Sequence, residues 1–208
     1  MAKSVDINLQ DALNLEPVAN KYQAQLNAAG ITVEFMVQLR TEIETLQAKD
    51  VGQKEAVAGK ETATRAQNEK MRLCRACQKK VINIAKNAYV DNRERLKEFH
   101  VGNAYIQGVA QMLTELAYLK SAVTTHQDEL ASWGADAALI TEIEVCIADL
   151  TAADNTQENA KNLQNEATVE RDRASKILKN SKNRIRRAAQ IVFADNPDVR
   201  KEFESTVE

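Results

Sequence analysis

Apolar residues recur along the chain at alternating spacings of four and three, the pattern of amphipathic helices that pack along a coiled-coil seam. The clearest run is Met112, Leu116, Leu119, Val123, His126 and Leu130. Two more runs follow it, one made of Leu139, Ile143, Ile147 and Leu150, and the other of Ile177, Ser181, Ile185, Ala188 and Val192. The pattern predicts an all-α protein built from long helices.

The same pattern occurs 104 residues earlier. The chain aligns with itself at that offset, without a gap, from Leu9 to Phe99. The matching runs are Leu15, Ala19, Tyr22 and Leu26, then Phe35, Leu39, Ile43 and Leu46, then Leu73, Cys77, Val81, Ile84 and Ala88. We interpret this as an internal duplication. Residues 1–103 form the first helical repeat and residues 104–208 the second, and we expect the two to pack together as one structural unit.

Each repeat is predicted to contain about three helical stretches. Gly30 and Gly134 end the first stretch, either as kinks or as sharp turns, and Thr32 or Asp136 can cap the second. Pro17 is expected to delay the start of the first helix in the first repeat.

The apolar pattern lapses at residues 50–53 and again at 154–157, so we expect a tight reversal of the chain at both places. About 40 residues would run into each reversal and about 40 out of it, in arms on the order of 60 Å long. Two such hairpins would bury their apolar stripes as an elongated antiparallel four-helix-type bundle. The alternative is a compact three-helix bundle for each repeat.

A short phrase recurs after each third stretch, DNRERLKEF from Asp91 and DNPDVRKEF from Asp195. Asn92 and Asn196 are good N-cap residues, and Pro197 suits the first turn of a helix. The phrase therefore predicts a short capped helix that folds Phe99 or Phe203 back onto the end of the bundle.

Composition narrows the class of protein. Gly and Pro number only six and two, which favours long helices, and aromatic residues make up 4%, so aliphatic side chains must form most of the core. The first residues contain no apolar stretch of signal-peptide length, and no run reaches the roughly 20 apolar residues that span a bilayer. Three cysteines do not suggest a disulfide scaffold. We expect a cytoplasmic protein without a membrane span, although export without a leader would leave no such signal.

The candidate chemistry is weak. Cys74 and Cys77 have CxxC spacing, but the second repeat has Leu178 and Ser181 there, and Cys146 is the one further thiol. His126 falls on an apolar seam, and no sequence motif of a nucleotide-binding loop, zinc protease or serine hydrolase occurs. We therefore expect no catalytic residue, no cofactor and no metal site, with a metal or redox protein as the least favoured alternative.

Charge is unevenly distributed although the net charge is only −2. Six basic residues and no acid lie between Lys70 and Lys86, seven basic residues and no acid lie between Arg173 and Arg187, and eight acids without Lys or Arg lie between Asp128 and Glu158. These segments can match neighbouring helices, direct contacts between molecules, or bind a polyanion such as nucleic acid. The candidate interaction face is Lys70, Arg72, Arg75, Lys79, Arg173, Lys176, Lys179, Lys182 and Arg186.

The pattern as a whole favours a non-enzymatic structural or assembly protein that acts through helical self-association, as a homo-oligomer or filament, or through contact with a protein partner. The alternative is nucleic-acid or other polyanion binding through the basic stretches. It is disfavoured because neither basic segment contains an aromatic residue to stack on bases.

Overall fold

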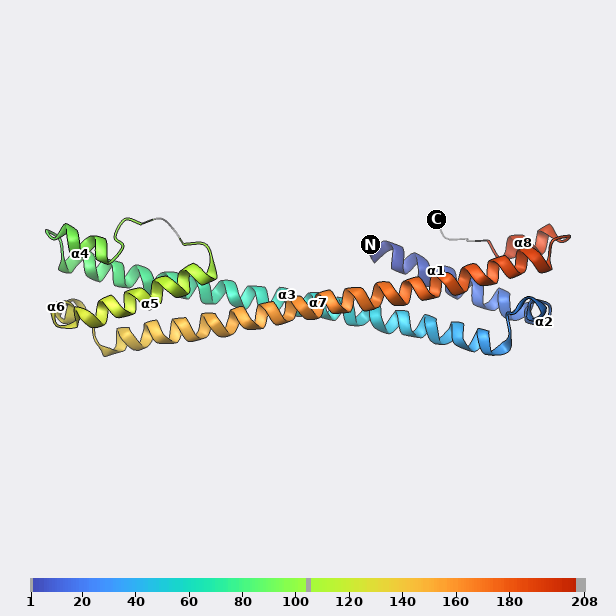
Figure 1. Cartoon of the computed structure of the whole chain (residues 1–208), viewed down its shortest axis with the longest axis horizontal. Coiled ribbons are helices and arrows are strands. Elements are labelled where there is room, and N and C mark those ends of the chain that lie inside the picture. The colour runs from blue at the N-terminus through green and yellow to red at the C-terminus, as the bar shows by residue number, and fades with distance from the viewer. Residues whose placement is uncertain (1, 104–105, 205–208) are drawn as a thin grey trace. The chain divides into compact units, whose positions relative to one another are not determined.

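The chain is all-helical, as the sequence predicts. The computed structural model describes residues 2–103 and 106–204, with side chains from Val5 onward. The described elements are α1 (Ala2–Lys21), α2 (Gln23–Leu26), the 3-10 turn η1 (Asn27–Ala29), α3 (Val33–Ala88), α4 (Arg93–Glu98), α5 (Val109–Thr125), α6 (Gln127–Leu130), the 3-10 turn η2 (Ala131–Trp133), α7 (Ala137–Val192) and α8 (Pro197–Glu202) (Figure 1).

The element bounds repeat along the chain. From α2 onward, each element of the first half begins and ends 104 residues before its counterpart in the second half, so α2 corresponds to α6, α3 to α7 and α4 to α8. This offset is the one at which the sequence aligns with itself. Counterpart residues in the two halves can therefore be compared directly.

The predicted reversals are wrong, because α3 and α7 are each continuous over 56 residues. The polar stretch at residues 50–53 lies inside helix α3 and is partly buried. Asp50 is buried there, and its Oδ2 forms an ion pair of 2.6 Å with Nζ of Lys54, one turn later. Gly52 costs a helix interior only about 1 kcal/mol relative to Ala, which is too little to end a helix that packs well elsewhere.

The predicted effect of Pro17 is also wrong. Helix α1 begins at Ala2 and passes through Pro17 to Lys21. Proline removes one helical hydrogen bond, but Pro17 lies on the less buried side of α1, where water can hydrate the carbonyl group left without a donor. Ala12, Leu15 and Ala19 are buried on the opposite side and hold the helix in place.

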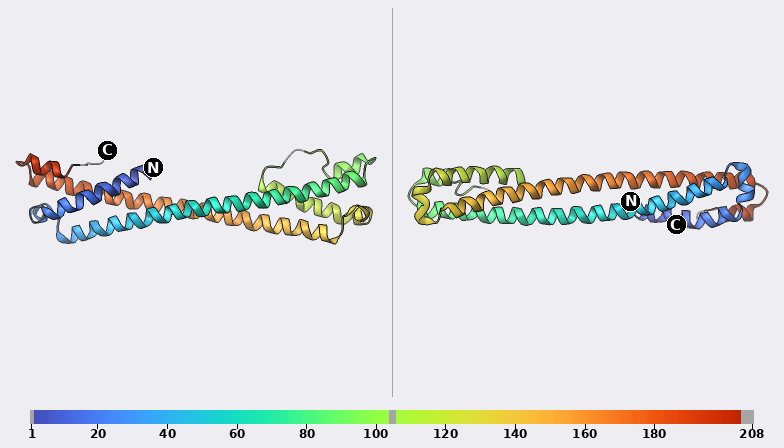
Figure 2. Two further views of the ribbon diagram at one scale, coloured as in Figure 1. Left: turned by 180° about the vertical axis from the view of Figure 1, so that it is seen from behind. Right: turned by 90° about the horizontal axis from the view of Figure 1, so that it is seen from below.

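The chain divides into two compact units, and neither coincides with a sequence repeat. The terminal unit contains the described residues up to Ala58 and from Leu163 onward, and the central unit contains those of Gly59–Asn162. Each unit therefore takes part of α3 and part of α7, so both repeats contribute to both units. Within the described residues, each unit has three long helical segments, where the sequence predicted a four-helix arrangement (Figures 1 and 2).

Each unit has its own apolar core. In the terminal unit, α1 packs with the first part of α3 and the last part of α7 around Leu15, Leu39, Ile43, Leu178 and Ile185. In the central unit, α5 packs with the last part of α3 and the first part of α7. The residues at the centre of that second core include Val81, Leu116, Leu119, Leu139 and Ile143.

The predicted turns and caps are confirmed. Gly30 and Gly134 adopt the left-handed conformation, with φ of 81° and 94°, so they are sharp turns. Thr32 Oγ1 then accepts from the backbone N–H of Phe35, and Asp136 Oδ1 accepts from that of Leu139. The sequence thus places both turns and both caps correctly.

The short helices α4 and α8 close the ends of the units as predicted. Asn92 accepts from the backbone N–H of Arg95, and Asn196 accepts from that of Val199. Phe99, just after α4, is fully buried against Tyr89 and His126, with ring centroids 5.9 and 6.0 Å apart. Phe203, just after α8, is buried in the same way against Phe193 and Tyr22.

Candidate interaction surface

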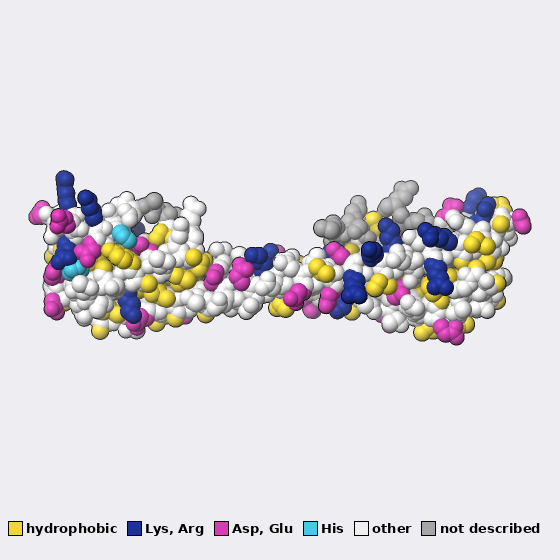
Figure 3. Space-filling model, in the orientation of Figure 1, with side chains coloured by type: hydrophobic (Ala, Val, Ile, Leu, Met, Phe, Trp, Pro, Cys, Tyr) yellow, Lys and Arg dark blue, Asp and Glu magenta, His cyan; other side chains and the backbone are white. Residues whose placement is uncertain are grey.

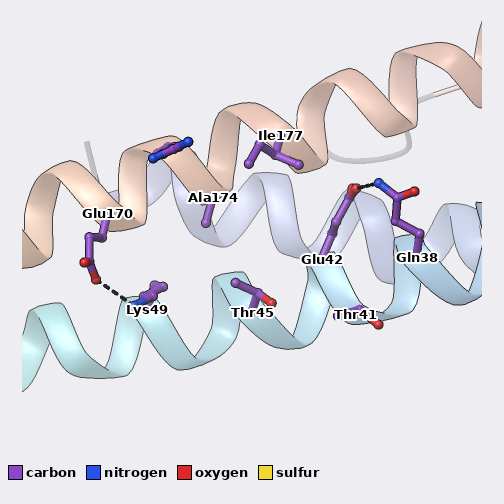
Figure 4. A pocket seen from close by; sticks show the side chains of 9 residues that line it. Gln38, Thr41, Glu42, Thr45, Lys49, Glu170, Ala174 and Ile177 are labelled. Atoms are coloured by element: carbon purple, nitrogen blue, oxygen red, sulfur yellow. Dashed lines mark hydrogen bonds and ion pairs between the residues drawn. The ribbon is translucent and has the colours of Figure 1, made fainter.

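An open groove of about 450 Å³ runs between α3 and α7 in the terminal unit (Figure 4). Side chains on successive turns of the two helices form its walls. Helix α3 contributes Gln38, Thr41, Glu42, Thr45 and Lys49, and α7 contributes Glu170, Arg173, Ala174 and Ile177. The groove is a surface of mixed character, in which aliphatic carbon lies beside charged groups.

Some charged side chains in the groove have hydrogen-bond partners, and one carboxylate oxygen lacks one among the described residues. Lys49 Nζ donates to Glu170 Oε2 at 2.6 Å and closes one end. Gln38 Nε2 donates to Glu42 Oε1 at 2.8 Å, as Figure 4 shows. The other oxygen of that carboxylate, Glu42 Oε2, is buried and has no hydrogen-bond partner among the described residues. A buried carboxylate oxygen without a donor is costly, so this atom is a place where a donor would be favourable.

In the central unit, side chains bridge the equivalent place. The counterparts of Ala174 and Thr45 are Lys70 and Asp149, which form an ion pair of 2.7 Å from α3 to α7. The counterpart of Glu42 is Cys146, which packs against the apolar core. The same place is therefore crossed by a lysine in the central unit and left open in the terminal unit.

From the groove onward, α7 presents a line of exposed residues that follow one another at spacings of four and three, here called the α7 ridge; its members Arg173 and Ile177 also line the groove. Its members are Val169, Arg173, Ile177, Asn180, Arg184, Arg187 and Ile191. The aliphatic members are 68%, 44% and 73% exposed, in chain order. Figure 3 shows Lys and Arg side chains interspersed with hydrophobic ones on the drawn face of this unit. A second hollow lies along the same line, between Asn180 and Ile191.

The sequence placed Ile177 and its counterpart Leu73 on a buried seam, and this assignment is wrong. Both are exposed, at 44% and 40%, while the next residues, Leu178 and Cys74, are buried. The four-three spacing fits either of two neighbouring lines on a helix. The packing of α1 and α5 selects the line through Leu178 and Cys74.

The predicted basic residues of α3 lie in the central unit, where most have a contact within the chain. Lys70 pairs with Asp149, and Arg72 pairs with Glu69 one turn earlier. Arg75 donates from Nε to the carbonyl oxygen of Ile106 at 3.3 Å. Lys79 is exposed and forms no ion pair with a described residue.

The predicted basic residues of α7 separate into two groups. Arg173, Lys176 and Lys179 form no ion pair within the described part of the chain, and their side chains reach solvent. Lys182 and Arg186 instead face inward and hold Asp11 of α1, with an ion-pair distance of 2.6 Å for each.

The Lys182–Asp11 pair is almost fully buried. Lys182 also donates to the backbone oxygen of Asn8 at 3.0 Å, and Arg186 donates to that of Phe203 at 2.9 Å. Burial lowers the pKa of Lys182, an effect that Asp11 opposes. Lys182 and Arg186 therefore join α1, α7 and the residue after α8, and they are not available to an outside partner. Spacing alone could not separate them from Lys179, because the acid that they hold, Asp11, lies on another helix.

Both histidines have carboxylate partners. His126 is buried, as expected for a seam residue with a satisfied nitrogen, and its Nε2 lies 2.8 Å from Glu98 Oε1 in α4. The hydrogen bonds from His126 and Arg95 lower the pKa of Glu98. His100 Nδ1 lies 2.9 Å from Glu115 Oε2, a partner that is distant in sequence. The counterpart of His126 is Tyr22, which donates to Glu202 of α8 at 2.8 Å. The contact therefore holds the short end helix of each unit, α4 or α8, here called the lid.

The three cysteines lie together in the central unit, although Cys146 is far from Cys74 and Cys77 in the sequence. Cys74 Sγ lies 3.4 Å from the carbonyl oxygen of Cys146, and the thiols of Cys74 and Cys77 both interact with Cys146. All three thiols are free. Burial, followed by the neighbouring Cys146, raises the pKa of Cys74 and of Cys77 to about 12.

We expect burial to slow the reaction of the Cys74 and Cys77 thiols with alkylating reagents. At pH 8 the folded chain should react quickly with iodoacetamide only at the half-buried Cys146, because the thiolate is the nucleophile and is scarce at Cys74 and Cys77. Reaction at these two residues should rise steadily as the pH approaches 12 or when urea is added. Peptide mass spectrometry measures all three rates, and equal rates at pH 8 would contradict the assignment.

Among the described residues, no group of three or more His, Cys, Asp or Glu side chains is arranged to hold a metal ion. No helix in the described ranges combines the length and apolar character needed to cross a membrane. The chain has no significant match to a known protein family, a curated protein or a solved structure.

Proposed function

We propose that the chain is a non-enzymatic structural or assembly protein that associates with copies of itself through the terminal unit. The α7 ridge is the observation that carries the proposal. It combines three exposed aliphatic residues with three arginines and Asn180 at helical spacing, and such a line is the form in which one helix packs against another. One of these arginines, Arg184, also donates to the carbonyl oxygen of Gly30 at 3.0 Å.

The arginine and aliphatic side chains of the α7 ridge are expected to contribute differently to the free energy of association. Exposed ion pairs contribute only about 0–1 kcal/mol each, so the arginines cannot hold an assembly together alone. Burial of Val169, Ile177 and Ile191 would supply most of the affinity, while the arginines select orientation and partner.

We further propose that the two halves arose by duplication, and that the four-helix arrangement is completed between copies. Each unit offers three long segments, and the groove between α3 and α7 could receive side chains from another helix. A helix from a second copy would bring the terminal unit to four.

Polyanion binding is the second candidate, because the terminal unit carries a row of basic side chains along α7 that form no ion pair with a described residue. The row consists of Arg173, Lys176, Lys179, Arg184 and Arg187. The two candidates differ in their response to salt and in their ligand. Self-association that depends on aliphatic burial should weaken only moderately between roughly 50 and 500 mM salt, by about tenfold or less in dissociation constant. Oligonucleotide binding through several phosphates would fall by orders of magnitude.

The test is light scattering and oligonucleotide titration on the same protein over this salt range. Substitution Ile177→Asp should abolish association by placing a charge in the aliphatic ridge, while Val145→Asp, at an exposed valine of the central unit, is the matched control. A monomeric wild-type chain that binds DNA or RNA tightly at physiological salt would refute self-association and support the second candidate.

A further inference from the structure

We infer that the groove between α3 and α7 of the terminal unit is a binding site for a lysine side chain from a second copy of the chain, with Glu42 as its anion. This inference rests on the proposed self-association and specifies one contact within it. It is carried by the groove itself, by the buried oxygen of Glu42, and by the way in which the central unit fills the same place.

The groove has the shape and chemistry for an alkylammonium group. Ala174 and Ile177 provide apolar carbon along which a lysine stem can lie, and Glu42 provides a carboxylate with one oxygen lacking a donor among the described residues. Gln38 already occupies the other oxygen and holds the carboxylate in position. Lys and Arg side chains commonly bury their carbon stems along apolar surface in this way.

The cations that line the groove do not satisfy Glu42. Lys49 is held by Glu170 at 2.6 Å, and Arg173 forms no ion pair with a described residue. A donor from outside the groove would satisfy this oxygen, and so would a rearrangement of Arg173. The second possibility is an outcome of the test below.

The central unit shows which group fits. At the position of Ala174 it has Lys70, whose ammonium crosses from α3 to Asp149 of α7 at 2.7 Å. In the terminal unit both charged residues are replaced, by Ala174 and Thr45, and the groove stays open. The terminal unit therefore has an uncharged pair where the central unit builds a lysine bridge, while an anion, Glu42, remains beside the opening.

A second copy of the chain supplies the complementary group. Several lysines form no ion pair within the described residues, among them Lys79, Lys176 and Lys179 of the predicted interaction face. A carboxylate oxygen without a donor and lysines without an acidic partner on the same chain are complementary between copies. A charge-assisted hydrogen bond formed in a desolvated groove also contributes more than an exposed pair.

Two variants test the inference by sedimentation equilibrium. Glu42→Gln keeps the shape of the side chain and removes its charge, and it should raise the dissociation constant of self-association about tenfold. The double substitution Thr45→Asp with Ala174→Lys copies the central unit and should close the groove from within, with a loss at least as large. Glu44→Gln, at an exposed neighbour on α3 paired with Arg40, is the control and should leave association unchanged.

Cross-linking identifies the donor. A mixture of isotope-labelled and unlabelled wild-type chains is treated with a carbodiimide, which joins a carboxylate to an amine only when the two are in contact. Mixed-isotope peptides joining Glu42 to Lys79, Lys176 or Lys179 are the expected product, and they should disappear in the double variant. Circular dichroism confirms that each variant keeps the wild-type helix content, and Glu42→Gln remains informative if the double variant fails to fold.

The outcomes separate the two proposals. If the wild-type chain associates but Glu42→Gln and the double variant associate equally well, the lysine site is wrong while self-association stands. The lysine site is also wrong if Glu42 cross-links only within its own chain, to Lys49 for example, or if Arg173 turns to satisfy it. A wild-type chain that stays monomeric at every concentration overturns both.

Discussion

Substitution of Asp11 by Ala should unfold or strongly destabilise the terminal unit, with a loss of about 3–5 kcal/mol in its free energy of unfolding. Asp11 is the shared anion of Lys182 and Arg186, at 2.6 Å from each. The Lys182 side chain is only 5% exposed, so its ammonium would be left buried without a counter-charge. The loss comes mainly from that stranded charge and less from the attraction removed.

Hydrogen exchange measured by mass spectrometry can assign this loss to one unit. Protection should fall in peptides from α1 and the last part of α7, and should change little in α5. Glu115→Ala is the matched control, because Glu115 is the counterpart of Asp11 and its partners there are the neutral Gln78 and the partly exposed His100. We expect a smaller loss from this control, and equal losses would contradict the role assigned to Lys182 burial.

Substitution of Phe99 by Ala should be the most damaging single change in the central unit, with a cost of about 3–5 kcal/mol. The ring is completely buried at the end of the core, between Tyr89 and His126, and α4 has no buried residue of its own. Removal of the ring should therefore release the whole of α4 and leave the His126–Glu98 contact exposed to water.

The single tryptophan makes this prediction easy to follow. Trp133 lies in η2 of the central unit, so its fluorescence reports on that unit in urea. Phe99→Ala should lower the fluorescence midpoint markedly. Phe203→Ala, the same change in the terminal unit, should lower it much less. Equal shifts would mean that the two units unfold as one and that the lids do not act locally.

The local structure could be predicted from the sequence because it depends on a few residues with strong preferences. Gly30 and Gly134 adopt a left-handed conformation that other residues resist, and Asn92 and Asn196 cap helices by short-range hydrogen bonds. The buried phenylalanines of the two lids follow from the repeated phrase that contains them. In each case the signal lies within a few residues of the structure that it determines.

The long-range arrangement could not be predicted in the same way. The polar stretch around Asp50 and Gly52 is compatible with a turn or with a solvated helix, and only packing on both sides decides for the helix. The spacing of Ile177 likewise fits a buried or an exposed line. Among the basic residues of α7, Lys182 and Lys179 look alike in the sequence, and an acid on another helix, Asp11, separates them.

The mass of the wild-type chain in solution tests the central claim most directly. Sedimentation equilibrium should be recorded from low to high micromolar concentration at physiological salt. We expect the mass to rise with concentration from that of one 23.1 kDa chain to a dimer or higher species. A mass that stays at 23.1 kDa over the whole range would contradict self-association through the terminal unit.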